Sequence, residues 1–95
     1  MPAYVIADID VQDTTKFEEY KKLAPPSSAP FGGRYLVRGG KVEGLEGAWM
    51  PQRFVVIEFP SADQARAWWN SPAYGAARSI RQMCARSNFI LVEGL

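Results

Sequence analysis

Histidine is absent from this chain of 95 residues, and its absence removes several kinds of site. Without an imidazole the chain cannot form the usual zinc sites, a histidine-ligated haem site or a Ser-His-Asp triad. Any catalysis would depend on carboxylates, tyrosine, arginine or a bound cofactor. We expect neither a metal nor a cofactor.

Cysteine and long apolar runs are also scarce. Cys84 is the only cysteine, so no disulfide can form within the chain, in agreement with a reducing compartment. No stretch approaches the roughly 18 consecutive apolar residues of a membrane-spanning helix, and the N-terminus lacks the pattern of a signal peptide. We expect a cytoplasmic protein with no membrane partner.

An excess of basic charge is missing as well. The chain has 11 basic and 10 acidic side chains, a net charge of +1, whereas a nucleic-acid-binding protein normally shows a basic excess or stripe. We therefore expect no nucleic-acid partner. Hydrophobic residues make up 47% and charged residues 22%, which is typical of a globular protein and predicts a single domain over residues 1–95.

Four apolar segments without a helical period predict strands. They are Ala3–Ile9, Arg34–Arg38, Arg53–Phe59 and Asn88–Glu93. We expect the second and third to pair as a hairpin. Gly39 and Gly40 end or bulge the second strand, since glycine tolerates positive φ, and a continuation of that strand over residues 41–46 stays open.

The first helix is expected over Thr14–Ala24, with Asp13 as its N-cap. Pro25 and Pro26 should end it, because proline has no amide donor and disfavours α geometry in the preceding residue. The stretch Pro25–Gly33 is then expected to be an irregular loop.

Two more helical segments follow the third strand. Ser61 begins a capping box, and the spacing of Trp68 and Trp69 predicts that both face the sheet. Ser71 and Pro72 then supply an N-cap and a first-turn proline for a helix over Ala73–Ala85. The small residues of that last helix are expected to form a core stripe: Ala73, Ala76, Ala77, Ile80 and Cys84.

The order strand, helix, strand, strand, broken helix, strand predicts an α+β sandwich of ferredoxin-like βαββαβ type. Right-handed crossovers place the helices on one face of the antiparallel sheet. The third and fourth strands carry apolar side chains on both sides, so the other face also needs cover. We expect a second copy of the chain to cover it, giving a homodimer with two-fold symmetry.

Three runs are distinctive: FGGRYLVRGG at 31–40, PQRFVVIEFP at 51–60 and SPAY at 71–74, with LVEG at 91–94 near the end. Together they resemble the DUF1330 family of uncharacterised bacterial proteins, over essentially the whole chain. The resemblance implies a dimeric α+β barrel and no assigned activity. Relatives by fold, such as antibiotic-biosynthesis monooxygenases and muconolactone isomerases, act on small, often aromatic molecules between sheet and helices. For this chain that is an analogy of fold. Pro25, Pro26 and Pro30 depart from the more helical pattern of the family.

Glu58 is the one candidate for a catalytic acid or base. It lies in the middle of an otherwise apolar strand, where a carboxylate either finds a cationic partner or has its pKa raised. We favour a structural ion pair with an arginine. Arg34 and Arg38 are expected to share one face of the second strand, where they could hold an anion bidentately or protect an edge strand from aggregation.

Tyr74, Arg78 and Arg81 are expected along the flank of the last helix. They suit a carboxylate or phenolate ligand, but we favour a solvated boundary where long side chains cover apolar surface. Trp49, near the hairpin turn, is either a lid over a pocket or a dimer contact.

Two functions stay open. A small acidic or aromatic metabolite could be bound or transformed between sheet and helices, without metal or haem. The side chains that would hold it are Arg38, Trp49, Arg53, Glu58, Tyr74 and Arg78. The alternative is a non-catalytic dimeric accessory or stress-related module, in which these residues are structural.

Overall fold

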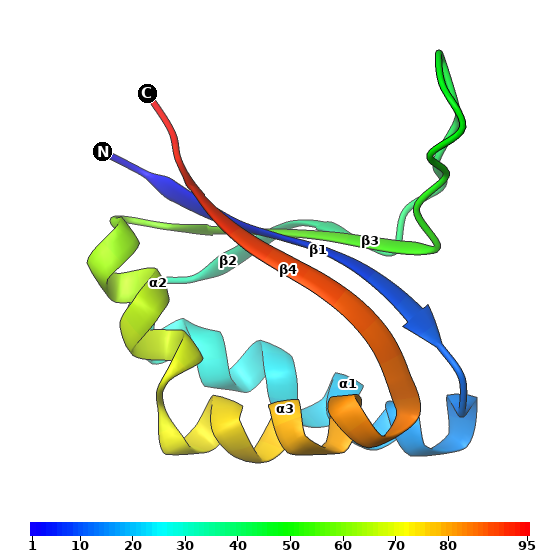
Figure 1. The fold of residues 1–95 in the computed structure, drawn as a ribbon. Coiled ribbons are helices and arrows are strands. Elements are labelled where there is room, and N and C mark those ends of the chain that lie inside the picture. The colour runs from blue at the N-terminus through cyan, green and yellow to red at the C-terminus, as the bar shows by residue number, and fades with distance from the viewer.

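A four-stranded antiparallel sheet carries three helices on one of its faces (Figure 1). The computed structural model describes residues 1–95. The strands are β1 (Ala3–Val11), β2 (Arg34–Arg38), β3 (Arg53–Phe59) and β4 (Ala85–Glu93), in the order β2-β3-β1-β4. The helices are α1 (Thr14–Ser28), α2 (Ala62–Trp69) and α3 (Pro72–Cys84), with a short 3-10 turn η1 (Ala29–Phe31). The α+β architecture expected from the sequence is confirmed. No helix is both long and apolar enough to cross a membrane.

The predicted N-caps are present. The Asp13 carboxylate accepts a hydrogen bond from the backbone N–H of Lys16 at 3.1 Å. Ser61 and Ser71 do the same for α2 and α3, each at 3.2 Å. Each cap satisfies one of the amide donors that a helix leaves unpaired at its start.

The first helix is longer than predicted, because α1 continues through Pro25 and Pro26 to Ser28. Each proline removes one helical hydrogen bond, but its fixed φ is compatible with helix. Buried contacts hold the last turn: the Ser27 hydroxyl donates to the carbonyl of Ala24 at 2.6 Å and accepts from Trp68 Nε1 at 3.0 Å. The prediction of an irregular loop over residues 25–33 is therefore wrong for its first half.

A β-bulge at Leu36 interrupts the pairing of β2 with β3. Arg34 pairs with Glu58 and Arg38 with Val55, so the two arginines lie on opposite faces of the sheet. The prediction that they share a face is wrong, because one extra residue reverses the alternation of the strand. The possible continuation over residues 41–46 is not a strand either.

On the face that meets the helices, the strand register aligns the side chains in rows, and three of these rows matter for the site. They are Tyr35-Ile57-Val5-Leu91, Arg38-Val55-Ala7-Phe89 and Arg53-Ile9-Ser87. We call this the inner face. Its Val, Ile and Phe side chains and the buried faces of α1, α2 and α3 form the hydrophobic core.

The buried stripe of α3 differs from the predicted one. It consists of Tyr74, Ala77, Arg81 and Cys84, whereas Ala73 and Ala76 are exposed. Both sets have helical spacing, and the helix turns its larger side chains inward because they bury more apolar surface. The expected solvated flank is therefore wrong for Tyr74 and Arg81, which are 0% and 4% exposed.

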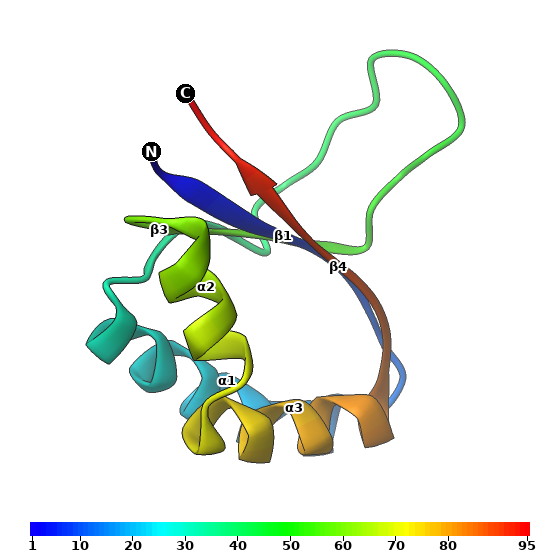
Figure 2. The same cartoon turned by 60° about the vertical axis from the view of Figure 1, so that its left-hand side comes forward.

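The opposite face of the sheet, which we call the open face, has no helix over it (Figures 1 and 2). Its apolar side chains are Tyr4, Ile6, Val37, Phe54, Val56, Ile90 and Val92. Residues 39–52 form a long hairpin loop, the arm, which rises on this side of the sheet (Figure 2). Asp8 fixes its base by accepting hydrogen bonds from Trp49 Nε1 at 3.1 Å and the backbone N–H of Gln52 at 3.0 Å. Apolar side chains thus lie on both faces of the sheet, as predicted, and the open face also carries charged residues: Asp8, Asp10, Arg34, Glu58 and Arg86.

Candidate functional site

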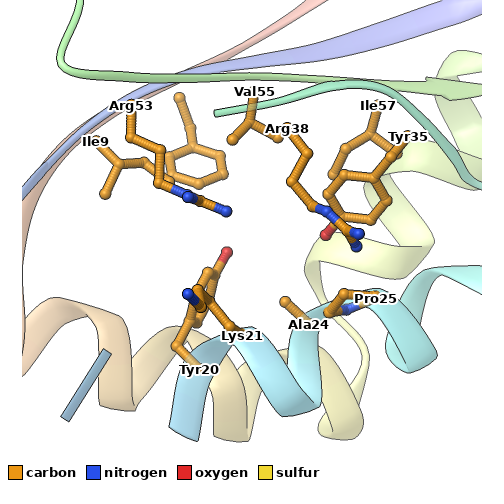
Figure 3. A pocket seen from close by; sticks show the side chains of 11 residues that line it. Ile9, Tyr20, Lys21, Ala24, Pro25, Tyr35, Arg38, Arg53, Val55 and Ile57 are labelled. Carbon is orange, nitrogen blue, oxygen red and sulfur yellow. The ribbon is translucent and has the colours of Figure 1, made fainter. Parts of the chain in front are cut away.

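A cavity of about 270 Å³ lies between α1 and the inner face (Figure 3). All four strands contribute to its wall, because the three rows of the inner face run beneath it. Its lining residues are Ile9, Tyr20, Lys21, Ala24, Pro25, Tyr35, Arg38, Arg53, Val55, Ile57 and Phe89. We call this space the first cavity.

Two arginines reach into the first cavity from neighbouring strands. Arg53 on β3 extends toward the Tyr20 hydroxyl, which rises from α1, and Arg38 on β2 extends beside the Tyr35 ring on the side of Pro25 (Figure 3). The Arg38 guanidinium carbon lies 5.3 Å from the ring centroid of Tyr35, and that of Arg53 lies 5.5 Å from the ring centroid of Phe17. Each aromatic ring helps to orient its guanidinium.

No carboxylate lines the first cavity. The ion pairs of the chain are Lys21 with Glu18, Arg34 with Glu58 and Arg66 with Asp63. The guanidiniums of Arg38 and Arg53 therefore have no acidic partner. Lys21, at the cavity rim, is held by Glu18 at 2.9 Å. Two cations with free donors in a partly apolar space are suited to an anion, because guanidinium binds carboxylates bidentately.

Buried phenols form the remaining polar surface. The Tyr20 and Tyr74 hydroxyls are hydrogen-bonded at 2.9 Å. Burial, and then the neighbouring Tyr74, raise the pKa of Tyr20. Burial and then Tyr74 also raise the pKa of Tyr35, to about 12. Both phenols are therefore neutral at physiological pH and can donate hydrogen bonds to a bound anion.

Arg81 adds a third arginine, behind the wall of the cavity. It is 4% exposed, has no acidic partner, and its Nε has no hydrogen-bond partner. Its guanidinium lies between two rings that line the cavity, 4.2 Å from the Phe89 centroid and 5.7 Å from that of Tyr20. Its charge lowers the cost of holding a negative charge nearby.

The family model described as "Domain of unknown function (DUF1330)" matches residues 2–95. The chain belongs to the DUF1330 family. The resemblance in its sequence runs is thereby confirmed. A comparison with curated proteins gives no match to this sequence.

Solved structures share the fold of this DUF1330 chain at low sequence identity. A protein of unknown function from Rhodopseudomonas palustris is 18% identical, with a TM-score of 0.79 over 99% of this chain and 82% of that one. A dimeric ferredoxin-like protein of unknown function from Jannaschia sp. is 11% identical, with a TM-score of 0.74 over 99% and 100%. SnoaB, a cofactor-independent oxygenase from Streptomyces nogalater, is 14% identical, with a TM-score of 0.69 over 99% and 93%. These likenesses establish the ferredoxin-like fold, and function has to be argued from the site.

Of the predicted ligand-binding residues, the structure brings Arg38, Arg53 and Tyr74 together. Arg38 and Arg53 line the first cavity, and Tyr74 lies behind Tyr20, joined to it through the hydroxyls. Their meeting depends on the register of β2 with β3 and on the packing of α1 against α3, neither of which is local in sequence.

Three other predicted residues lie outside the cavity. Glu58 is on the open face, where its carboxylate accepts from Arg34 at 2.9 and 3.0 Å. Trp49 is in the arm and bonds to Asp8. Arg78 donates to the carbonyl of Trp69 at 2.9 Å and stacks on its ring at 4.9 Å.

Sequence reasoning did not select Tyr20, Tyr35 or Phe89 for the site. Tyr20 belongs to the apolar repeat of α1, and Tyr35 and Phe89 alternate into the inner face like any core residue. The sequence did offer one signal for Tyr20. Its phenol lies on the apolar repeat of a helix, and a buried hydroxyl needs a hydrogen-bond partner.

Proposed function

We propose that this DUF1330 chain binds a small anionic metabolite in the first cavity, with its acidic group on Arg38 and Arg53. The observation that supports this most strongly is that two guanidiniums without a carboxylate partner line one cavity. Arg53 is half-buried and Arg38 is exposed at the mouth of the cavity. A bound anion would accept charge-assisted hydrogen bonds from both, and these are stronger than hydrogen bonds between neutral groups.

The walls define the rest of the ligand. Val55, Ile57 and Phe89 are apolar, and Tyr35 presents a ring beside Arg38. The volume of about 270 Å³ lies at the lower end of the range for small-molecule sites, roughly 300–1,000 Å³. The proposed ligand is therefore a compact monocarboxylate or phenolate with an aromatic or aliphatic body.

Binding is a better-supported function than carboxylate catalysis. Glu58, the candidate acid or base, lies on the other side of the sheet and is paired with Arg34. The cofactor-independent oxygenase from Streptomyces nogalater shares this fold, and at 14% identity the likeness carries no reaction over to this chain. We propose no reaction.

We also infer that the chain is a homodimer whose open faces pack together. Ile90 and Val92 of this face are 58% and 42% exposed, and the arm beside it exposes Leu45, Trp49 and Met50. Contiguous apolar surface of this kind is characteristic of protein interfaces. The Jannaschia neighbour is described as dimeric, which supports a dimeric assembly for this fold.

Benzoate tests the binding site. At 100 times its dissociation constant it should stabilise the protein by about 2.7 kcal/mol, whereas uncharged benzamide should have far less effect. Arg38→Met and Arg53→Met should each weaken benzoate binding by about 1.5 to 3 kcal/mol, the usual contribution of a hydrogen bond to a charged group. Thermal unfolding with increasing ligand measures these differences.

Arg34→Met is the matched control, because Arg34 lies on the same strand as Arg38 but on the open face. It should leave the benzoate affinity unchanged. Equal stabilisation by benzoate and benzamide, or equal losses in all three variants, would contradict the proposed anion site.

A further inference from the structure

The ring of Phe89 forms part of the wall of two cavities. The first is the cavity described above, and the second, of about 210 Å³, lies between α2 and β4. Phe89 is the only residue that lines both. Val5, Trp69 and Leu91 form much of the apolar wall of the second cavity.

The strand register gives the first cavity a direction. Arg38, Val55, Ala7 and Phe89 form one row across all four strands, from the edge strand β2 to the edge strand β4. Three strand spacings of about 4.8 Å place the backbones of Arg38 and Phe89 about 14 Å apart. Arg38, Val55 and Phe89 of this row line the first cavity, so an anion held by Arg38 has its apolar body directed over Val55 toward Phe89.

Neighbouring side chains fix the Phe89 ring in place. The Trp69 ring, which lines the second cavity, packs against it with the centroids 5.4 Å apart. The Arg81 guanidinium lies 4.2 Å from its centroid. Both contacts restrain the ring, which forms the wall at this end of the first cavity.

We propose that Phe89 determines the maximum length of the ligand, by closing the apolar end of the first cavity and separating it from the second. This inference rests on the proposed anion site. It narrows the proposed ligand class by length. Monocarboxylates whose apolar body ends at Phe89 bind, and monocarboxylates with a longer body are excluded. Without the ring, the second cavity becomes a subsite for a longer apolar tail.

Straight-chain alkanoates of increasing length test this directly. For the wild type, affinity should rise about fourfold with each buried methylene until the chain reaches Phe89, and then stop rising. In Phe89→Ala the rise should continue for several further methylenes. Phe89→Leu retains more of the core and should show a smaller extension in the same direction. Calorimetric titration of the full chain measures each affinity, and thermal unfolding identifies the folded variants.

Leu91→Ala is the matched control, because Leu91 lines only the second cavity. This substitution enlarges the second cavity but keeps the Phe89 ring between the two cavities. The limiting alkanoate length should therefore equal that of the wild type. If both Phe89 variants still bind short acids but show the same limiting chain length as the wild type, this inference is overturned while the proposed anion site stands. Failure of the wild type to bind benzoate or any alkanoate would overturn the proposed anion site together with it.

Discussion

Tyr20 and Tyr74 form the buried hydroxyl pair on which the polar side of the first cavity depends. Tyr74 is 0% exposed and its hydroxyl has the Tyr20 hydroxyl as its partner at 2.9 Å. A buried hydroxyl that loses its partner costs more than the hydrogen bond itself contributes, whereas replacing both partners by apolar groups is nearly neutral. The contributions of the two hydroxyls to stability are therefore coupled.

Substituting one member of this pair should reveal the coupling. Tyr20→Phe should lower the free energy of unfolding by about 1 to 3 kcal/mol, since the Tyr74 hydroxyl is left without a partner. The double variant with Tyr74→Phe should lose clearly less than the sum of the two single losses. Urea unfolding measures all three, with Tyr4→Phe on the open face as control. Additive losses would contradict the coupling.

Alkaline pH should weaken the fold through Tyr35. Its pKa is raised from 10.0 to about 12 in the folded chain, so the unfolded chain loses this proton first. The contribution of this proton to stability is complete below pH 10 and is lost as the pH rises through 12. Tyr35→Phe should make the decline in stability less steep over this interval. An equal slope in both proteins, measured by denaturant unfolding at each pH, would contradict the burial of the phenol.

At the scale of the element, the end of α1 shows how tertiary contacts outweigh local preference. The sequence correctly predicted the start of the helix at Asp13 but ended it too early, because Pro25 and Pro26 remove local hydrogen bonds. What holds the last turn is Trp68, which is distant in sequence and bonds to Ser27. Such a contact has no signature in the helix itself.

Ser27→Ala should therefore destabilise the protein. It removes the acceptor of Trp68 Nε1, which is fully buried, and the bond to the carbonyl of Ala24. A loss of about 1 to 3 kcal/mol is expected from the unpaired indole N–H. The control is Ser79→Ala, whose hydroxyl makes the same kind of bond within an exposed part of α3. Thermal unfolding that gave equal losses for both would contradict this account of the helix end.

The candidate site shows the same division between local and distant information. Arg38 and Arg53 were predicted from their residue type, but the face on which Arg38 lies depends on the bulge at Leu36. A bulge is defined by the pairing with β3. The alternation of β2 alone therefore places Arg34 and Arg38 on the same face, which is wrong. Tyr20 was missed because a phenol on an apolar repeat is usually a core residue.

At the scale of the whole molecule, the order and type of the elements followed from the sequence because each strand and cap has a local pattern. The apolar nature of both sheet faces followed from alternation in β3 and β4. Cavities depend on how the layers meet, and the sequence carries no local signal for that. The fold therefore could be predicted more completely than the site.

The open face provides a test of assembly. Ile90→Lys places a charge on this face at a side chain that is already 58% exposed, so it should convert a dimer to a folded monomer. Met83→Lys, on the exposed side of α3, is the control and should leave the assembly unchanged. Sedimentation equilibrium distinguishes the two states. A wild type that is monomeric at micromolar concentration would contradict the proposed dimer.

The central claim is that Arg38 and Arg53 together hold the anionic group of a ligand. Nuclear magnetic resonance of the arginine Nε–H groups during a benzoate titration tests it most directly, because each guanidinium reports separately. The account predicts saturable shifts of Arg38 and Arg53 with a common dissociation constant, while Arg34 on β2 and Arg86 on β4, both on the open face, stay unchanged. Shifts that are absent at Arg38 and Arg53, or equal at all four arginines, would contradict it.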